Sequence, residues 1–289
     1  MSQVTKKSSD AEIEQRESVQ LSALLVIHNE EKRIRDCLEG VKFCDEIVVV
    51  LDRCTDGSKN IVLEYTDRII EGGWPVEGDR RNVGNEACRG DWILEIDADE
   101  RIPVELAEEI RQTVIRGDAD YYLIPVDNYI GNNLVRYGWG AQFGTASVSR
   151  LCRKGTKSWG MERVHPALHW KEGARRGEKL KHRLVHYVDD NISDMIRRFD
   201  SYSTARAKDL VESGNIGTMP HNIRRIFSRF WRCFIGRKGY REGGYGFLIA
   251  TFAALYPVVS HIKARYESEQ LIPTTLNIDP SGSRPPSPE

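Results

Sequence analysis

Short apolar runs alternate with charged, helix-like stretches over the first hundred residues of the chain. The run LSALLVI at 21–27 precedes the helix-like EEKRIRDCLEGV, and both features fit a strand followed by a helix. The β-branched run EIVVVL at 46–51 is typical of a strand buried on both faces. Asp56 is placed to cap a helix through KNIVLEY.

Two further strand–helix units follow. DRIIE predicts a short strand before the helix-like DRRNVGNEACRG, and WILEI at 92–96 predicts a fourth strand, with Pro103 in the first turn of the next helix. This alternation predicts a Rossmann-like α/β fold, a mostly parallel sheet flanked by helices with right-handed crossovers. Ligands of such sheets bind beyond the carboxyl ends of the strands, so we look for chemistry there.

The pattern divides the chain into four parts. Residues 1–19 are polar without a hydrophobic period and residues 268–289 are rich in Pro and Ser, so we predict a disordered leader and a disordered tail. Between them we predict a catalytic domain at 20–212 and a basic, aromatic helical region at 213–267. The leader has no apolar signal segment, which predicts a cytoplasmic protein.

The predicted helical region resembles a membrane-associating appendage. From Ser213 to Arg241 it holds seven basic residues and no acidic one. Its apolar residues recur at the spacing of one helix face: Ile223, Ile226, Phe227, Phe230, Trp231 and Phe234. A cationic amphipathic helix of this kind suits an anionic lipid surface, so we expect a peripheral or monotopic protein on the inner face of a membrane.

Residues 243–262 follow without a charged side chain. A transmembrane span, burial against the catalytic domain and an anchor that enters one leaflet are three interpretations of this run. Gly residues, Pro257 and His261 make a span the least favoured, and we favour the anchor.

Composition narrows the class of protein. The chain has 40 % apolar and 29 % charged residues with a net charge of −1, which is ordinary for a globular protein. The near-neutral charge and the missing RNA-binding signatures argue against nucleic acid as a partner. Six cysteines without zinc-site spacing predict reduced thiols. No G-x-G-x-x-G follows the first strand, which excludes a dinucleotide-dependent dehydrogenase.

Polar, mostly acidic residues end three of the predicted strands. The first ends in His28-Asn29-Glu30, the second in Asp52 and the fourth in Asp97-Ala98-Asp99-Glu100. Carboxylates brought together at one sheet edge repel each other unless a cation lies between them. A hard divalent ion, Mg²⁺ or Mn²⁺, would resolve the repulsion. For each aspartate taken singly, the alternative is a helix cap or a solvated strand end.

These residues resemble the family 2 glycosyltransferases of the GT-A fold. That family has an HNE-like triplet after the first strand and a D-x-x-S-T-D-G-like turn after the second, here Asp52 to Gly57. An R-N-x-G helix and G-D-W-I-L-x-x-D-A-D-E follow, here at 81–84 and 90–100. The order and the intervals agree from His28 to Glu100.

The resemblance implies a role for each matching position. Asp52 would hydrogen-bond the nucleotide base, and Arg81 would lie near the ribose or the diphosphate. Asp97 would contact the ribose or an ordered water, and Asp99 would ligate the metal. The first triplet places Asn29 and Glu30 with the donor-binding residues.

The second half resembles, less strictly, the lipopolysaccharide-core branch of the family. The matching segments are 150–153, 159–160, 164–166, 184–187 and 202–205. That branch often has a glutamate directly after the histidine, where Pro166 stands here. For the catalytic base, Glu162 is our first candidate and Asp127 the second. His165 is a metal ligand, a catalytic residue or a structural hydrogen-bonding group.

The resemblance therefore implies an inverting, metal-dependent transfer of a sugar from a nucleotide diphosphate donor. UDP is the favoured nucleotide and glucose a candidate sugar. The acceptor would be a hydroxyl of a lipid-linked or lipopolysaccharide-type glycan. One alternative is a catalytically inactive GT-A scaffold at the membrane. A phosphotransferase of haloacid-dehalogenase type is rejected. In that family the D-x-D motif follows the first strand, whereas here it follows the fourth predicted strand.

Overall fold

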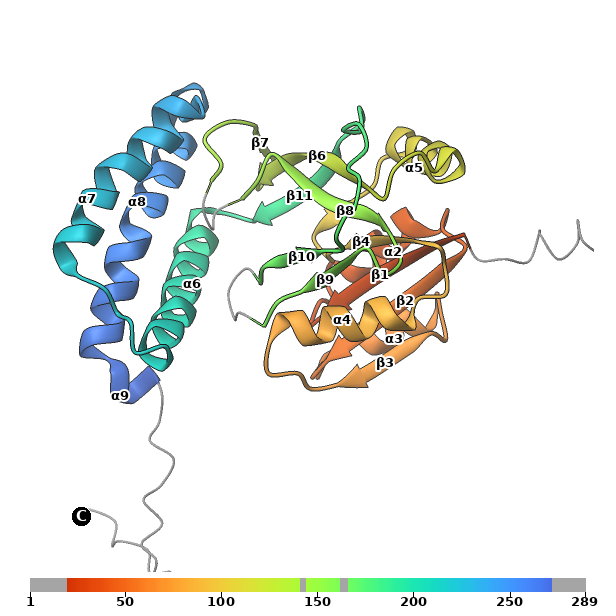
Figure 1. The fold of residues 1–289 in the computed structure, drawn as a ribbon, viewed down its shortest axis with the longest axis horizontal. Coiled ribbons are helices and arrows are strands. Elements are labelled where there is room, and N and C mark those ends of the chain that lie inside the picture. The colour runs from red at the N-terminus through yellow and green to blue at the C-terminus, as the bar shows by residue number, and fades with distance from the viewer. Residues whose placement is uncertain (1–19, 141–143, 162–165, 272–289) are drawn as a thin grey trace, which may run out of the picture.

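The apolar runs at the start of the chain form the parallel half of a mixed sheet (Figure 1). The computed structural model describes residues 20–140, 144–161 and 166–271. Four strands pair in the order β3-β2-β1-β4, all parallel, which confirms the predicted arrangement. They are β1 (Leu21–Ile27), β2 (Glu46–Asp52), β3 (Ile69–Gly72) and β4 (Trp92–Ile96).

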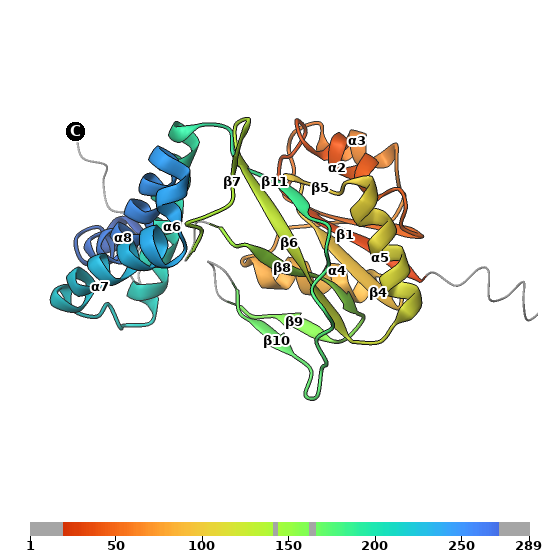
Figure 2. The ribbon, with the colours of Figure 1, turned by 90° about the horizontal axis from the view of Figure 1, so that it is seen from above.

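Helices cover both faces of this parallel half (Figure 2). They are α2 (Ile34–Val41), α3 (Ser58–Leu63), α4 (Glu77–Ala87) and α5 (Val104–Arg116). Successive side chains of β1 point to opposite faces, as in any strand. Leu25 belongs to the core cluster that includes Leu38 of α2 and Leu106 of α5, whereas Leu24 packs with Cys88 at the end of α4. Burial on both faces explains why these strands read as continuous apolar runs.

The sheet continues beyond β4 in mixed directions, so the prediction of a mostly parallel sheet holds for its first half only. β8 (Ser147–Arg153) lies between β4 and β6 (Tyr121–Ile130) and is antiparallel to both. β11 (Leu184–Asp189) is parallel to β6 and also pairs with the two-residue β5 (Glu100–Arg101). This pairing brings β11 beside the acidic end of β4.

Three short strands complete the sheet lobe. β7 (Asn133–Val135) extends β6, and β9 (Lys157–Trp159) forms a small antiparallel pair with β10 (Leu168–Trp170). The small pair lies against α4.

A lobe of helices follows β11 and stands beside the sheet (Figures 1 and 2). It comprises α6 (Ile192–Glu212), α7 (Met219–Trp231), a π-helical turn (Arg232–Gly236), a 3₁₀ turn (Gly239–Glu242), α8 (Gly243–Tyr266) and α9 (Ser268–Leu271). α8 packs against both α6 and α7 around Met195, Ile249 and Tyr256. The predicted boundary after residue 212 coincides with the end of α6. Because α6 packs with the C-terminal helices, it belongs to the helical lobe in this structure.

The predicted apolar face of α7 is divided between packing and solvent. Phe230 and Phe234 contact the ring of Phe247 on α8, at 5.8 and 6.2 Å between ring centroids. Phe227 and Trp231 are 74 % and 66 % exposed. Among the described residues, one helical stretch, Gly239–Tyr266, is long and apolar enough to cross a membrane, and half of its most apolar part is buried in the protein.

Candidate active site

The loops that follow β1 and β2 are tied together by the first polar triplet. His28 Nδ1 lies 2.6 Å from the Asp52 carbonyl, and Asn29 Oδ1 accepts a hydrogen bond from the Thr55 amide at 2.7 Å. Asn29 has a left-handed backbone with φ of 56°, which asparagine tolerates better than most residues. The Glu30 amide donates to Ser58 Oγ at 2.8 Å. The triplet therefore fixes the shape of the rim above the strand ends.

Asp52 ends β2 and is only 2 % exposed. Its carboxylate accepts hydrogen bonds from the Trp74 amide at 3.1 Å, from Arg80 Nη1 at 2.8 Å and from Arg53 Nε at 3.0 Å. Burial alone would raise the pKa of Asp52, but these hydrogen bonds and charges outweigh it and hold the pKa below its usual value. Asp52 is thus a buried, ionised carboxylate held between two arginines.

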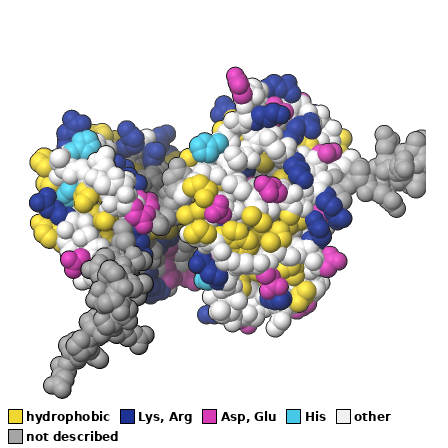
Figure 3. Space-filling view, turned by 60° about the horizontal axis from the view of Figure 1, so that its bottom comes forward, with side chains coloured by type: hydrophobic (Ala, Val, Ile, Leu, Met, Phe, Trp, Pro, Cys, Tyr) yellow, Lys and Arg dark blue, Asp and Glu magenta, His cyan; other side chains and the backbone are white. Residues whose placement is uncertain are grey.

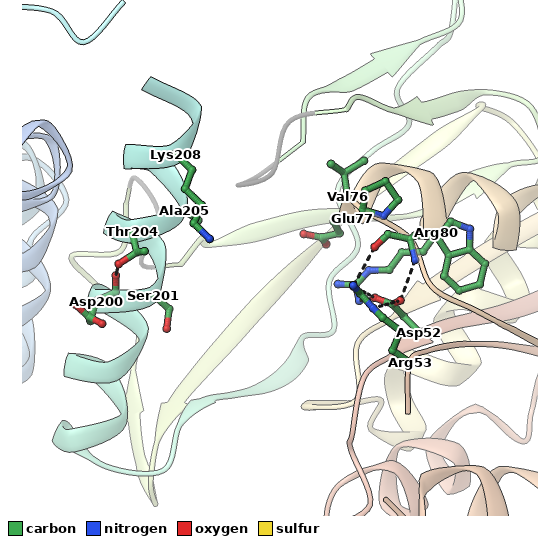
Figure 4. Close-up of a pocket in the computed structure, with 12 residues that line it drawn as sticks. Asp52, Arg53, Val76, Glu77, Arg80, Asp200, Ser201, Thr204, Ala205 and Lys208 are labelled. Atoms are coloured by element: carbon green, nitrogen blue, oxygen red, sulfur yellow. Dashed lines mark hydrogen bonds and ion pairs between the residues drawn. The ribbon is translucent and has the colours of Figure 1, made fainter. Parts of the chain in front are cut away.

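A cavity of about 490 Å³ opens beside Asp52, between the sheet lobe and α6 (Figure 4). Arg53, Glu77 and Arg80 line its sheet side, and α6 lines the other side with Thr204 and Lys208, among others. Lys208 points across the cavity toward Glu77 (Figure 4). The furrow between the two lobes is also visible on the molecular surface (Figure 3). A volume of this size suits a ligand as large as a nucleotide sugar.

Asp97, directly after β4, lies in a network of charged groups. Arg81 Nη2 donates to its Oδ1 at 2.9 Å, and Arg150 Nη2 donates to its Oδ2. Arg150 also bonds Glu100 Oε1 at 2.8 Å, and Arg81 Nε bonds Glu77 at 2.7 Å. Burial raises the pKa of Asp97, but the charges of Arg150 and Arg81 outweigh it and hold the pKa well below its usual value. The network keeps Asp97 ionised and fixed in position.

The R-N-x-G segment of α4 explains how Arg81 reaches this network. Asn82 exchanges two hydrogen bonds of 2.9 Å with the Trp159 backbone, which fastens α4 to β9. The Arg81 guanidinium lies 4.8 Å from the Trp159 ring centroid, within cation–π range. Arg81 is 8 % exposed and bonded to carboxylates, so in this structure it holds Asp97 in place.

Asp99 differs from both other aspartates, because one of its oxygens has no partner. Its Oδ1 is buried and makes no hydrogen bond, while Oδ2 lies 3.3 Å from His186 Nε2 on β11. Burial lowers the pKa of His186, but the hydrogen bond and the charge of Asp99 outweigh it and raise the pKa above its usual value. Burial and the charge of Asp99 also raise the pKa of Glu30 nearby. This concentration of negative charge needs a cation.

The residues present fit a divalent ion. A buried carboxylate oxygen without a partner costs free energy, and a bound Mg²⁺ or Mn²⁺ would satisfy it. Within residues 20–140, 144–161 and 166–271, no three His, Cys, Asp or Glu side chains lie close enough to form a complete metal site. Magnesium sites of this kind use one or two carboxylates and leave the remaining positions to substrate phosphates and water.

Residues 22–164 match the family model described as glycosyl transferase family 2. The chain belongs to this family of glycosyltransferases.

The glycosyltransferase also resembles curated proteins along most of its length. It is 28 % identical over 276 residues to the lipopolysaccharide core biosynthesis glycosyltransferase LpsC of Rhizobium meliloti, covering 85 % of this chain and 94 % of that protein. It is 26 % identical over 271 residues to an uncharacterized glycosyltransferase of Rickettsia bellii, covering 90 % of each. Among solved structures, S. aureus TarS 1–349 overlaps 87 % of this chain and 92 % of that one, with 14 % identity and a TM-score of 0.45.

The structure places one of the candidate bases of the glycosyltransferase away from Asp99. Asp127 lies within β6, where its carboxylate accepts from Arg183 Nε at 2.5 Å and from Arg136 at 3.3 Å. Its neighbour Asn128 bonds His186 Nδ1 at 2.9 Å, on the face that carries Asp99. Successive strand residues point to opposite faces, so Asp127 faces away from Asp99. Glu162 and His165 lie outside the described residues.

Four residues join the site that the sequence did not single out as functional: Arg80, Lys208, Arg150 and His186. Arg80 adjoins the R-N-x-G motif, and the segments at 150–153, 184–187 and 202–205 had been noted for their resemblance to the lipopolysaccharide-core branch. The missing information was the pairing of β11 with β5, which puts His186 opposite Glu100. Short strands separated by more than eighty residues leave no local signal for such a pairing.

Proposed function

We propose that this glycosyltransferase moves a sugar from a UDP-sugar to a hydroxyl of a lipid-linked or lipopolysaccharide-type glycan, with inversion at the anomeric carbon. The observation that carries the proposal is the buried, unpartnered oxygen of Asp99 at the end of β4. The relative named as a lipopolysaccharide core glycosyltransferase, which this chain covers almost completely, supports the acceptor class. Glucose remains our candidate for the transferred sugar.

Asp99 and His186 would hold Mg²⁺ or Mn²⁺, with His165 as the further candidate ligand from the sequence. When bound, the ion would neutralise the charge that develops on the departing diphosphate. The chain's own cations near the cavity are Arg53, Arg80 and Lys208. We assign Lys208 to the diphosphate, because it points into the cavity from α6 (Figure 4).

The nucleotide base would bind at Asp52. Its carboxylate is already bonded to Arg53, Arg80 and the Trp74 amide, so a base can gain a hydrogen bond only by replacing one of these. Arg53 is the group we expect to move, because its side chain is 60 % exposed whereas that of Arg80 is 23 % exposed. Asp97 and Arg81 would form the side of the site that faces the ribose. Asn29 and Glu30 would form its rim.

Transfer requires a base that removes the proton of the acceptor hydroxyl as its oxygen attacks the anomeric carbon. Glu162 remains our candidate for this base. Asp127 is the weaker candidate, because its carboxylate is bonded to two arginines and faces away from Asp99.

The helical lobe would place the enzyme on the cytoplasmic face of a membrane. Exposed apolar side chains gather where α7 meets α8: Phe227, Trp231, Ile235, Tyr240 and Phe247, the aromatic patch. The same segments of the chain carry exposed basic residues: Arg224, Arg232, Arg237, Lys238 and Arg241. An apolar patch rimmed by cations suits an anionic lipid surface. Four of the five patch residues belong to α7 and the following turns and Phe247 lies in the first turns of α8, so contact with lipid does not require α8 to span the membrane.

Nucleotide binding with and without metal tests the proposal directly. UDP should raise the melting temperature in the presence of Mn²⁺ and much less in EDTA, because ligand binding stabilises the native state. Release of UDP from UDP-glucose should then depend on a truncated lipopolysaccharide acceptor. Equal stabilisation by UDP with and without metal would contradict the metal site, and GDP or CMP stabilising more than UDP would contradict the donor.

A further inference from the structure

A second cavity, of about 560 Å³, lies in the helical lobe between α6, α7 and α8. Arg206 of α6 and Arg225 and Arg229 of α7 line it, with His221 at one side. The rest of the wall combines apolar residues with uncharged polar ones: Leu210, Ile216, Gly217, Tyr256 and Pro257, with Asn215, Asn222 and Ser260. Among the residues that the structure describes, none of those lining this cavity is acidic.

The arginines of this cavity are poorly neutralised. Among the described residues, Arg206 has one distant carboxylate partner, Asp209, at 3.9 Å. Arg225 and Arg229 have no carboxylate partner within the described parts of the chain, and the one polar contact of Arg229 is with the Ala253 carbonyl at 3.5 Å. Burial, together with the charge of Arg225, lowers the pKa of Arg229. Like charges that gather in a partly buried cavity with a single distant carboxylate beside it are stabilised by a bound anion.

The cavity is separate from the donor site, although both use α6. Residues 200, 201, 204, 205 and 208 line the donor cavity, and residues 206 and 210 line the cationic one. At 100° per residue these two sets lie on opposite faces of the helix. The helix therefore forms a wall between the two cavities. Figure 1 shows α6 between the sheet lobe and the helices α7 and α8.

We propose that this cationic cavity binds the phosphate group of an organic phosphate, with Arg225, Arg229 and Arg206 around the phosphate oxygens. Guanidinium groups are suited to phosphate because they donate two parallel hydrogen bonds in one plane. The cavity is far larger than a phosphate ion, and its apolar wall of Leu210, Ile216 and Pro257 suits the organic part of the ligand. A lipid headgroup and a soluble phosphate ester share this chemistry.

Binding to the full chain tests the proposal, with no donor or acceptor present. The soluble probe is glycerol 3-phosphate, measured by calorimetry. The lipid probe is phosphatidylcholine vesicles with and without phosphatidic acid, measured by sedimentation. Arg225→Gln should weaken binding roughly tenfold or more, since a hydrogen bond to a charged group is lost. Arg265→Gln is the matched control, because it removes the same charge from an exposed position of α8 that lines neither cavity and lies outside the aromatic patch.

Binding of either probe supports the proposal if Arg225→Gln weakens this binding and Arg265→Gln changes it by less than about twofold. Vesicle binding alone identifies a lipid headgroup as the source. The proposal is overturned if the two variants lose affinity equally, or if neither probe binds the wild type. UDP affinity should stay unchanged in Arg225→Gln. A wrong assignment of the cationic cavity can therefore be distinguished from a wrong assignment of the donor site. Arg229→Gln repeats the test at a second position.

Discussion

The three aspartates at the strand ends differ in how completely their oxygens are hydrogen-bonded. Asp52 and Asp97 are each held by two arginines, whereas one oxygen of Asp99 is buried without a partner. A satisfied carboxylate is a structural or orienting group, and an unsatisfied one is a site for a cation. The difference gives each aspartate its own expected mutant phenotype.

Asp99→Asn should abolish transfer and weaken UDP binding in Mn²⁺. The amide keeps the size of the side chain but removes the charge that holds the ion. Calorimetric titration of UDP in Mn²⁺ and in EDTA measures the effect, and affinity in EDTA should match the wild type. Turnover near the wild-type value would show that Asp99 only caps a turn.

Asp52→Ala should raise the donor KM by about tenfold and change kcat less, since a contact to the base contributes mainly to binding. The change also releases Arg53 and Arg80, so circular dichroism should first show that the variant is folded. Steady-state kinetics with a varied UDP-sugar concentration provides the measurement. A donor KM equal to that of the wild type would remove Asp52 from base recognition.

The base can be identified by comparing Glu162→Gln with Asp127→Asn. Loss of a general base costs about 10²–10⁴-fold in rate, so Glu162→Gln should lose that much while UDP affinity survives. Asp127→Asn should lose far less, because Asp127 faces away from Asp99. The reverse order of rates, measured with saturating donor, would exchange the two assignments. His165→Ala belongs to the same series, since loss of metal-dependent UDP affinity would identify it as a ligand.

Sequence reasoning found the residues at strand ends because their position follows from the order of the elements. It did not find which way Asp127 points. The run YYLIPVDNYI in β6 is buried on both faces over much of its length, so it lacks the alternation that would assign each side chain to a face. His186 was missed as a site residue for a different reason, because its contact with Asp99 depends on a long-range strand pairing.

At the scale of elements, local periodicity determines β1 to β4 and the helices between them. The second half of the sheet depends on pairing between strands as short as two residues, which carry too few side chains for any period to be recognised. The apolar spacing of residues 223–234 predicts α7, but the division of its apolar face between packing and exposure depends on where α8 lies.

The contact between α4 and β9 depends on a glycine. A Cβ at Gly78 would lie 1.7 Å from the Gly160 carbonyl oxygen, a backbone atom that cannot rotate away. Gly78→Ala should therefore lower the free energy of unfolding by about 1–3 kcal/mol or more, and should also slow transfer by shifting Arg81. Urea denaturation followed by tryptophan fluorescence measures the first effect.

Gly244→Ala is the matched control for that change. Gly244 lies in α8 with no atom near the position of a Cβ, so alanine should be neutral or stabilising by up to about 1 kcal/mol. A Gly78→Ala variant as stable as Gly244→Ala would show that α4 and β9 are farther apart than described.

At the scale of the whole molecule, two lobes enclose the donor cavity and one of them carries the aromatic patch. Phe227→Glu combined with Trp231→Glu should reduce binding to anionic vesicles by about tenfold or more, since each buried aromatic side chain contributes about 1.5–3 kcal/mol. Sedimentation with phosphatidylglycerol vesicles measures it. Ile115→Glu on α5, at a site 77 % exposed, is the control and should bind as the wild type does. Equal binding by all three proteins would place the membrane contact elsewhere.

The charged network around Asp97 also limits how this enzyme can diverge over evolutionary time. Arg81, Arg150, Asp97 and Glu100 neutralise one another, so replacing any one unbalances the charges that remain; replacing Arg150, which leaves buried Glu100 without its arginine, should cost about 3–5 kcal/mol. That cost is a large fraction of the free energy of unfolding of a typical domain, about 5–15 kcal/mol. A lineage can therefore alter this network only by paired substitutions or after gaining stability elsewhere. We expect these four positions to change together among descendants of one ancestor, while the exposed partners of surface ion pairs drift independently.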